Sequence, residues 1–511
     1  MYFDQGWSRD EAYSFYNTSQ GSHLIPYAWF LALEQHNNET LFNDPQNIQK
    51  FGYIPQTSTN EGKEYVLPIG FVKDDISDPV LSASLVESRL ANNVDDNNNG
   101  NNVWLGLTCS ACHTSEIQYN NKTFRIDGGA ALADMQTMLK DMYAALIATS
   151  NDDAKLTRFA KNVLNEGGYN ETEKAFIKSQ LDHYTIWLSD YINVNYKGTT
   201  APYGYGRLDA FGAILNRVTS TLLENPNNGA PANAPVSFPY LWNTAQLDWV
   251  QWNGSVNNHI GRNIGEATGV FARTILTTDN EEDRFYSSAN LRNLDQLEHL
   301  MGKLDSPKWT QEGASLPPIN DEKAEKGKVL FAKNCVACHG VKDENGQYPM
   351  TAPNDFGKQS IVITMTPLKD VRTDPLMAMN FVSPQFDVEP GQMRKYVIED
   401  AVAMATKIGI AKGLSGQALI QMQEATVQKY RNMPKVPRAL VLSAASSRII
   451  KRKFAENDLL DKPDIMLAIS GYRNEEKNPA DLVAYKGRPL NGIWATAPYM
   501  HNGSMSTLYQ T

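Results

Sequence analysis

Cysteine and histidine are scarce in this chain, which has four cysteines and eight histidines among 511 residues. All four cysteines lie in two Cys-x-x-Cys-His strings, at 109–113 and 335–339, so none is left over for disulfide bonds. Long apolar runs are lacking too, since none approaches the roughly 20 residues that a membrane-spanning helix requires. The sequence therefore predicts a protein without a membrane span.

Basic residues are outnumbered: 57 Asp and Glu stand against 47 Lys and Arg, which gives a formal charge of −10. Nucleic acids and anionic membranes repel acidic surfaces, so we expect neither as a partner. Hydrophobic residues make up 41% of the chain, an ordinary share for a globular protein with a sizeable core. The first residues, 2–7, are globular in character and show no secretory signal.

Each Cys-x-x-Cys-His string has the spacing that covalent haem attachment requires. Two thiols bond the vinyl groups, and the imidazole of the next residue reaches the iron. The first string supplies Cys109, Cys112 and His113, and the second supplies Cys335, Cys338 and His339. The alternatives are a redox dithiol and a split metal site, although zinc normally needs four converging ligands. We predict two covalently bound haem c groups.

Covalent haem attachment normally takes place outside the cytoplasm. We therefore expect a periplasmic or secreted protein whose signal segment is absent from this chain.

Helical periodicity dominates the chain. Apolar residues recur at intervals of three and four near 132–146, 154–166 and 171–191. A further helix is expected after Asn320, which can cap it, and this helix leads into Cys335. We predict a mostly α fold: two cytochrome c-like domains with long loop-rich insertions and little β structure. The predicted parts are an N-terminal extension (1–80), the first haem domain (81–315) and the second haem domain (316–511).

Two segments are predicted to be surface loops from their content of Asn, Asp, Pro and Gly: residues 92–102 and 222–238. The string from Asp95 to Gly100 imitates the start of a calcium-binding loop. Gly106 stands where the closing Glu belongs, so a plain polar loop is the preferred interpretation.

The distal ligand of each haem decides function, because an iron with two protein ligands transfers electrons whereas an open position binds dioxygen or peroxide. His501 lies in a turn bracketed by Pro498 and Gly503, which presents three possible ligands in a row. The other two are Tyr499 and Met500. An ordinary buried histidine is the alternative at this position.

The segment 249–266 mixes aromatic, polar and glycine residues, as the wall of a pocket does. Its predicted catalytic-site residues, beside His113, are Trp249, Trp252, Arg262 and Glu266. Plain core packing is the alternative for the tryptophans, and a structural ion pair is the alternative for Arg262 and Glu266. His259 belongs to the same segment. The remaining histidines are predicted to be structural or exposed: His23, His36, His183 and His299.

Seven strings spread over the chain carry a family resemblance: 20–29, 67–74, 106–113, 125–129, 206–211, 262–266 and 498–503. In these strings the chain resembles the large dihaem oxygenases typified by the bacterial rubber oxygenase and by relatives that act on unsaturated fatty acids. These enzymes belong with the dihaem cytochrome c peroxidases. Family members usually run further past the last string, so we expect either a trimmed end or a shorter second domain here.

The resemblance implies a division of labour between the two haems. The His113 haem would be the site of chemistry, with an open or dioxygen-occupied distal face. The His339 haem would be six-coordinate and store electrons, with His501 as its second ligand. Met500 and Tyr499 stay open for that role, because Met or Tyr fills it in related enzymes.

Three functions follow, and the leading one is an oxygenase that uses dioxygen at the His113 haem. It would oxidise or cleave an unsaturated apolar substrate, such as polyisoprene or a fatty acid. The alternatives are a dihaem peroxidase, which reduces hydrogen peroxide with electrons from a small redox protein, and a plain electron-transfer protein. The long insertion at 150–310 leaves room for a substrate channel, which favours the oxygenase.

Overall fold

The computed structural model describes residues 1–60, 63–76, 102–196, 198–199, 201–311, 313, 315–354, 357–459, 462 and 479–510. The string from Asp95 to Gly100 lies outside the described residues. Helices cover about 48% of the chain and strands about 13%, in small sheets, which confirms the predicted mostly α fold.

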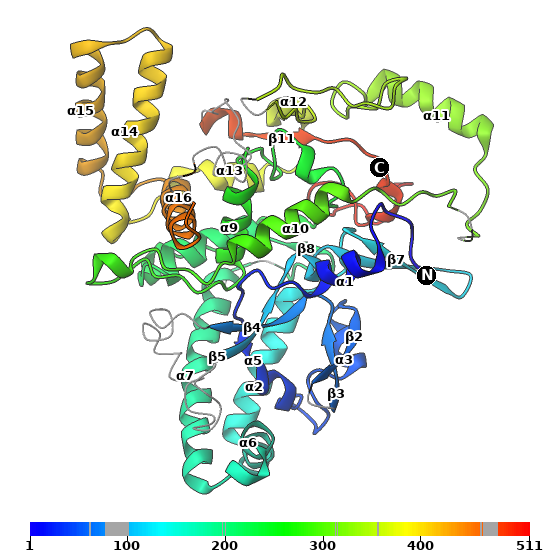
Figure 1. Ribbon diagram of the computed structural model, residues 1–511, viewed down its shortest axis with the longest axis vertical. Coiled ribbons are helices and arrows are strands. Elements are labelled where there is room, and N and C mark those ends of the chain that lie inside the picture. Colours follow the sequence, from blue (N-terminus) through cyan, green and yellow to red (C-terminus); the bar gives the residue numbers. More distant parts are fainter. Residues whose placement is uncertain are drawn as a thin grey trace.

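Three long helices build a lobe at one end of the molecule (Figure 1): α5 (Met135–Asn151), α6 (Asp153–Gly168) and α7 (Glu171–Tyr196). They confirm the three predicted amphipathic helices. The Asp134 and Asp152 carboxylates accept hydrogen bonds from backbone N–H groups in the first turns of α5 and α6. These N–H groups have no carbonyl partner within their own helix. Trp29 packs edge-on against Phe159 of α6, so the N-terminal segment and these helices share one core.

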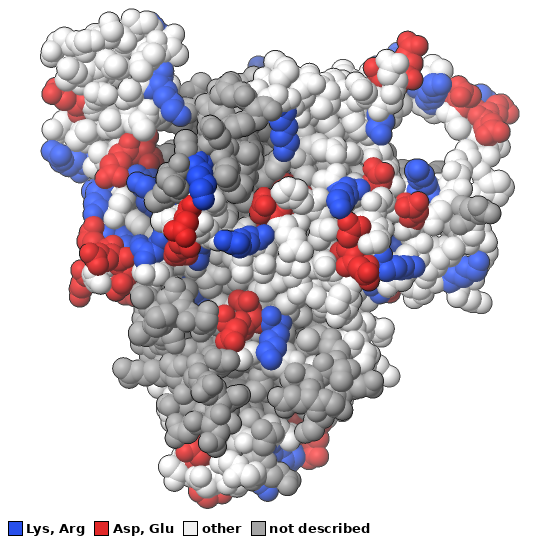
Figure 2. All heavy atoms as spheres, in the orientation of Figure 1, with Lys and Arg blue, Asp and Glu red and all other residues white. Residues whose placement is uncertain are grey.

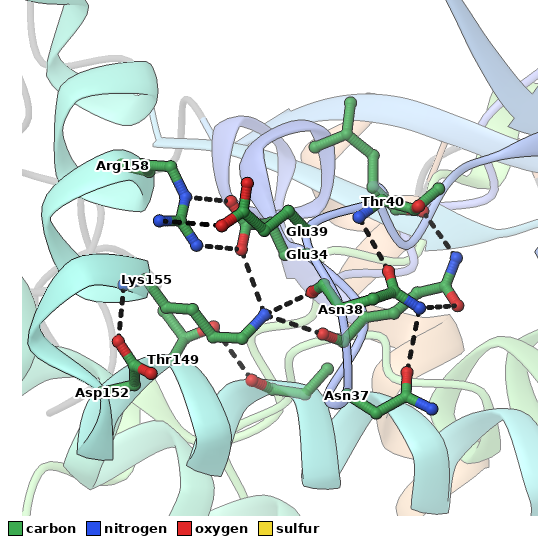
Figure 3. Close-up of polar contacts among 12 residues, drawn as sticks. Glu34, Asn37, Asn38, Glu39, Thr40, Thr149, Asp152, Lys155 and Arg158 are labelled. Atoms are coloured by element: carbon green, nitrogen blue, oxygen red, sulfur yellow. Dashed lines mark hydrogen bonds and ion pairs between the residues drawn. The ribbon is translucent and has the colours of Figure 1, made fainter.

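A polar clamp fastens the N-terminal segment to α6 (Figure 3). The Glu34 carboxylate accepts the Arg158 guanidinium at 2.6 and 2.8 Å and the Lys155 ammonium at 3.0 Å. Lys155 also donates to the Gln35 carbonyl at 3.0 Å. Burial raises the pKa of Glu34, but the hydrogen bonds and charges of Arg158 and Lys155 outweigh that effect and leave the pKa lowered. The clamp is therefore an ionic contact at neutral pH.

The strands of the described residues pair antiparallel. The largest sheet has the order β1-β5-β4. Its strands are β1 (Ile25–Pro26), β5 (Asn102–Leu107) and β4 (Phe71–Ile76). The two-stranded sheets are β2–β3 (Pro55–Asn60, Lys63–Pro68), β6–β7 (Thr114–Tyr119, Lys122–Asp127), β8–β9 (Arg207–Leu208, Val236–Ser237) and β10–β11 (Thr364–Pro367, Ala484–Gly487). The first Cys-x-x-Cys-His string connects β5 to β6, so two sheets hold its ends.

A second core joins helices from both halves of the chain: α9 (His259–Gly269), α10 (Leu291–Lys303) and α16 (Arg438–Glu456). Ile260 and Ile264 of α9 belong to the same buried cluster as Ala445 and Ile449 of α16. This cluster crosses the predicted domain boundary at residue 315. The two predicted haem domains, which remain a prediction, thus share core side chains.

Two elements stand away from the body in Figure 1. One is the hairpin of α14 (Arg394–Ala411) and α15 (Gly416–Asn432), and the other is α11 (Asp321–Asn334). The Asn320 side chain accepts the Lys323 N–H and caps α11, as predicted. No residue of α11 is buried, and Figure 2 shows an opening between this segment and the body.

The shorter helices are α1 (Arg9–Asn17), α2 (Tyr27–Ala32), α3 (Pro45–Lys50), α8 (Ala210–Asn216), α12 (Leu368–Val371) and α13 (Leu376–Val382). No helix in the described ranges combines the length and the apolar character needed to cross a bilayer. Acidic and basic side chains are interspersed over the face drawn in Figure 2.

The predicted surface loop at 222–238 is largely irregular backbone, as expected, but only part of it lies at the surface. Residues such as Glu224, Asn227 and Asn233 are exposed, whereas others are buried. Ala232 is 1% exposed and Ala234 is 3% exposed. The Asn216 amide explains how irregular backbone can lie there: it donates to the Ala230 carbonyl at 2.6 Å and accepts the Ala230 N–H at 3.0 Å. Side-chain amides thus satisfy backbone groups that water would otherwise have to reach.

Candidate haem sites

The first Cys-x-x-Cys-His string is a tight turn held from several sides. Residues Cys109–Ala111 form one 3-10 turn, and the His113 N–H donates to the Cys109 carbonyl at 3.0 Å. Gly70, at φ 77°, lies so close to Ala111 that a Cβ there would collide with its backbone. The Cys112 carbonyl accepts the Ala131 N–H at 3.0 Å. The orientation of the string is therefore set by the surrounding fold.

The side chains of Cys109, Cys112 and His113 line one cavity together. The cavity has a volume of about 1350 Å³, counted out to open solvent. Most of its wall is apolar and includes Leu208, Phe211, Ile214, Val236, Phe238 and Val250. Both thiols and the imidazole thus face the same space, as attachment of one haem demands.

Desolvation decides the protonation states at this string. It raises the pKa of the Cys109 and Cys112 thiols to about 12 and lowers the pKa of His113 to about 4. The Pro239 backbone opposes the shift at His113, but Nδ1 of that ring makes no well-formed hydrogen bond. His113 is consequently a neutral imidazole, which is the form that ligates iron.

Charged groups are placed on the same wall: Arg262, Glu266, Lys486 and Arg488. Arg262 is 6% exposed and donates to Glu298 and to the Asn263 side chain, yet its buried Nη1 has no hydrogen-bond partner among the described residues. Buried donors are nearly always paired, so this atom suits a carboxylate of a group held in the cavity. The first site therefore fits a haem by its thiols, its imidazole and its basic wall.

Strand β11 and the residue after it connect the two attachment strings. The Arg488 side chain reaches the first cavity, while its backbone carbonyl accepts the Nδ1–H of His339 at 2.7 Å. A carbonyl can only accept, so Nδ1 carries the proton and Nε2 is left free for iron. Gly487 packs on Cys338 so closely that a Cβ would meet the Cys338 carbonyl. The second string thus fits a haem too, with His339 already oriented.

Lys486 of the same strand is 7% exposed and lies in the wall of the first cavity. Burial lowers its pKa well below 10.5, the charges of Arg488 and Arg262 lower it further, and Glu266 opposes them. Its ammonium lies 5.7 Å from the Trp252 ring centroid. A bound anionic group in this cavity would relieve the repulsion among these three cations.

The turn at 498–503 separates its three candidate ligands. Met500 is 46% exposed, and the Tyr499 hydroxyl donates to the Trp494 carbonyl at 3.2 Å. His501 is 8% exposed, with its ring 4.1 Å from Tyr485 of β11. Burial lowers the pKa of His501, and Asp374 opposes that shift through its charge and its backbone. Tyr499 is as buried as His501, at 8% exposed, but its hydroxyl is already hydrogen-bonded to Trp494. His501 is thus the buried candidate that carries an imidazole, and its role as a ligand remains a prediction.

The structure brings together only part of the predicted catalytic set. Trp252 and Glu266 line the first cavity, and Glu266 accepts the Gln251 amide at 2.8 Å. Trp249 is buried but is not one of the side chains that line this cavity. His259 instead faces Glu298 at 3.2 Å, within the network that also holds Arg262. His259 is therefore a structural neighbour of the wall.

Four remaining histidines lie where they were expected. His23 is buried against Asp74 at 2.7 Å, and His36, His183 and His299 are exposed. Sequence reasoning missed Lys486 and Arg488, because basic residues beside a short strand carry no periodic signal of a cavity wall. Across the described ranges, no three His, Cys, Asp or Glu side chains gather closely enough to hold a metal ion.

Comparisons with known proteins support a haem protein. The family model for cytochrome c matches residues 324–393, and the model described as RoxA-like, cytochrome c-like matches residues 484–511. Protein y4iJ of Sinorhizobium fredii is 28% identical over 99% of this chain and 79% of its own length. Protein y4iM of the same organism is 21% identical over 60% of this chain and 51% of its own. No solved structure matches.

The two matched ranges contain the second attachment string, strand β11 and His501. The chain is accordingly a c-type cytochrome related to the RoxA-like proteins, with a redox function.

Proposed function

We propose that this relative of the RoxA-like c-type cytochromes is an enzyme with two haem c groups, which oxidises an unsaturated apolar substrate with dioxygen at the His113 haem. One haem is attached at Cys109 and Cys112, and the other at Cys335 and Cys338. The observation that carries the proposal is the apolar cavity that the first string lines. A haem held by this string would share the cavity with any second reactant that enters it.

When bound, the haem supplies dioxygen or peroxide binding and electron transfer. The residues of this chain supply the rest. His113 would bind the iron as a neutral imidazole, and the basic residues of the wall, Arg262, Lys486 and Arg488, would bind the haem carboxylates. The apolar wall holds the substrate and keeps water out, so that oxidation is directed at carbon.

The apolar character of that wall supports an unsaturated hydrocarbon chain as the substrate class, as in polyisoprene or a fatty acid. Leu208, Ile214 and Phe238 present only carbon to the cavity. Such surfaces bind apolar chains mainly through the hydrophobic effect, at roughly 25 cal/mol per Å² of surface buried.

The second haem serves as the electron store in this proposal. His339 is oriented by the Arg488 carbonyl, and His501 is the proposed second ligand. A low-spin haem with two protein ligands exchanges electrons without binding substrate. We propose a periplasmic or secreted location, where haem attachment takes place.

A peroxidase is the second candidate, and one observation favours it. Glu266 and Gln251 form a hydrogen-bonded polar pair in the wall of the first cavity. Desolvation raises the pKa of Glu266, with Arg262 opposing the shift. A carboxyl group of that kind can move a proton during peroxide cleavage. A small redox protein would then supply the electrons.

Two parallel assays separate the candidates. The purified holoprotein is given oleate, linoleate or polyisoprene with dioxygen, and products are followed by mass spectrometry. In the second assay it is given hydrogen peroxide with a reduced cytochrome. The oxygenase yields product that anaerobic incubation abolishes. Turnover in the second assay alone would establish the peroxidase. If neither haem binds carbon monoxide, the protein is an electron carrier.

The number of haems is tested independently of activity. Intact mass should exceed that of the polypeptide by two haem groups, and Cys335→Ala with Cys338→Ala should remove one of them. A mass with one haem group or none contradicts the proposal.

The proposed second ligand is tested by His501→Ala, with the exposed Met500→Ala as the matched control. The His501 change should convert one low-spin haem to high-spin, and the Met500 change should leave both haems as they are. The reverse result assigns the role to Met500.

A further inference from the structure

A second cavity adjoins the first one on the side facing α16. It encloses about 910 Å³, counted out to open solvent, and lies between α9 and α16. The two cavities share five wall residues: Phe211, Ile214, Gln251, Arg262 and Glu266. Because these residues line both cavities, they form the partition between them. The outer cavity therefore lies next to the cavity that the first attachment string lines.

Small residues from both helices line this outer cavity and leave its space unfilled. Gly261 and Gly265 lie one turn apart on α9, and Ser443 and Ser446 contribute from α16. A Cβ at Gly265 would stand 3.8 Å from the Ser446 hydroxyl oxygen. Any larger side chain at 265 would extend into the passage, because the facing position offers only a serine.

The partition itself is polar. Gln251 has a left-handed backbone (φ 66°) and donates its amide to Glu266 at 2.8 Å. Arg262 is almost fully buried beside them, and its unpaired Nη1 belongs to a residue that lines both cavities. A single hydrogen bond between two flexible side chains is weak enough to open on the microsecond timescale of side-chain and loop motion.

We infer that ligands reach the His113 haem through the passage between α9 and α16, and that the Gln251–Glu266 pair is its gate. The inference rests on the proposed function, since it assumes a haem with an exchangeable position in the first cavity. Gly265 and Ser446 set the width of the passage and thereby the size of ligand that enters. Both positions control access, and neither side chain touches the attachment string.

Ligand association in the reduced holoprotein tests the passage without any catalytic turnover. Carbon monoxide and tert-butyl isocyanide are mixed with the protein, and the haem absorbance is followed by stopped flow. Gly265→Leu should slow the bulky isocyanide about tenfold or more and carbon monoxide much less, with the dissociation rate falling in step. Gln251→Gly, which keeps the left-handed backbone, should speed the isocyanide instead.

The matched control is Gly302→Leu on α10. Gly302 is also a helical glycine, it is exposed, and a Cβ there meets nothing within 4 Å. It lines neither cavity. Gly302→Leu replaces a helical glycine by leucine, as Gly265→Leu does, and so raises helix propensity in the same way. Because Gly302 lines neither cavity, its association rates should equal those of the unmodified protein.

A reversible plug tests the same passage in a single preparation. Because all four native cysteines lie in the attachment strings, Ser446→Cys adds a lone thiol facing the passage. Labelling it with a bulky methanethiosulfonate should slow isocyanide association, and reduction of the label should restore the rate. Gly302→Cys labelled in the same way should change nothing.

The outcomes separate the passage from the proposed function. Rates that are unchanged in both Gly265→Leu and the labelled Ser446→Cys protein overturn the passage alone. If neither haem binds carbon monoxide, the proposed function is overturned, and the passage with it. Slower association with an altered equilibrium affinity in Gly265→Leu would instead indicate damage to the haem site, and it too contradicts the inferred role.

Discussion

The two haem-attachment strings have the same chemistry and opposite surroundings. Ser110 and Ala111, inside the first string, are 1% and 2% exposed, whereas Val336, inside the second, is 37% exposed. The first string connects two sheets and lines a cavity; the second follows α11, a helix with no buried residue. The same Cys-x-x-Cys-His spacing thus occurs once in an enclosed setting and once in an exposed one, and the packing around each string makes the difference.

Strand β11 relates the two sites. Alternate side chains of a strand point to opposite faces, which is how Lys486 and Arg488 reach the first cavity while Gly487 lies against Cys338. The Arg488 carbonyl also orients His339. A shift of strand β11 at the wall of the first cavity can thus alter the position of His339 at the second site without any movement of a whole domain.

The largest effect on stability is expected when each haem is removed in turn, and the difference between the two losses tests the contrast between the two strings. Cys109→Ala with Cys112→Ala should lower the free energy of unfolding by about 5 kcal/mol or more, because unfilled cavity costs about 24 cal/mol per Å³. Cys335→Ala with Cys338→Ala should cost clearly less, since that string lies at an exposed edge. Urea denaturation followed by circular dichroism measures both, and equal losses would contradict the comparison.

The next largest loss in the free energy of unfolding is expected when a charged residue of the first cavity wall is replaced. Arg262→Leu leaves Glu298 buried without its guanidinium partner, which should cost about 3–5 kcal/mol. Arg292→Leu, at an exposed position of α10, is the matched control and should cost less than about 0.5 kcal/mol. Thermal unfolding of both variants, at equal haem content, tests this; similar melting temperatures would show that the wall network does not stabilise the fold.

The Glu34 clamp holds the lobe that packs around the first site. Glu34→Gln should cost about 1.5–3 kcal/mol at pH 7, the range for hydrogen bonds to charged groups. The exposed Glu39, 3.5 Å from Arg158, is the matched control, and Glu39→Gln should cost under about 1 kcal/mol.

The stabilisation that Glu34 contributes to the folded state decreases as the pH falls. Its folded-state pKa is lowered from 4.5, so its stabilisation is present above pH 4.5 and is lost as the pH falls through the lower folded value. Unfolding curves of the native protein and Glu34→Gln should therefore converge in acid. A difference that persists at the lowest pH would contradict an ionic clamp.

The smallest effect is expected beside the second site. Lys326→Ala on α11 removes an exposed ion pair with Glu322 and should change the free energy of unfolding by less than about 0.5 kcal/mol. A loss above about 1 kcal/mol would mean that α11 is packed in solution, and the contrast between the two strings would shrink accordingly.

Local chemistry and local periodicity were enough to predict several features from the sequence. The two attachment strings follow from covalent spacing. The helices at 135–196 and the cap at Asn320 follow from the helical repeat and from unpaired N–H groups. Trp252, Arg262 and Glu266 were predicted as site residues from one short segment with glycines, and all three lie in the cavity wall, whereas Trp249 of the same segment does not. Their catalytic role stays a prediction.

Only the tertiary structure decided which string faces a cavity and what surrounds it. The wall joins residues near 109, 208–266 and 486–488, and no local pattern reports that these segments meet. The buried part of the 222–238 segment, which was predicted to be a surface loop, depends on the Asn216 amide, whose partner is fourteen positions away. By itself the sequence determined where haem attaches, because attachment is a matter of adjacent atoms; long-range packing determined what each haem meets, because burial and charge are properties of the assembled fold.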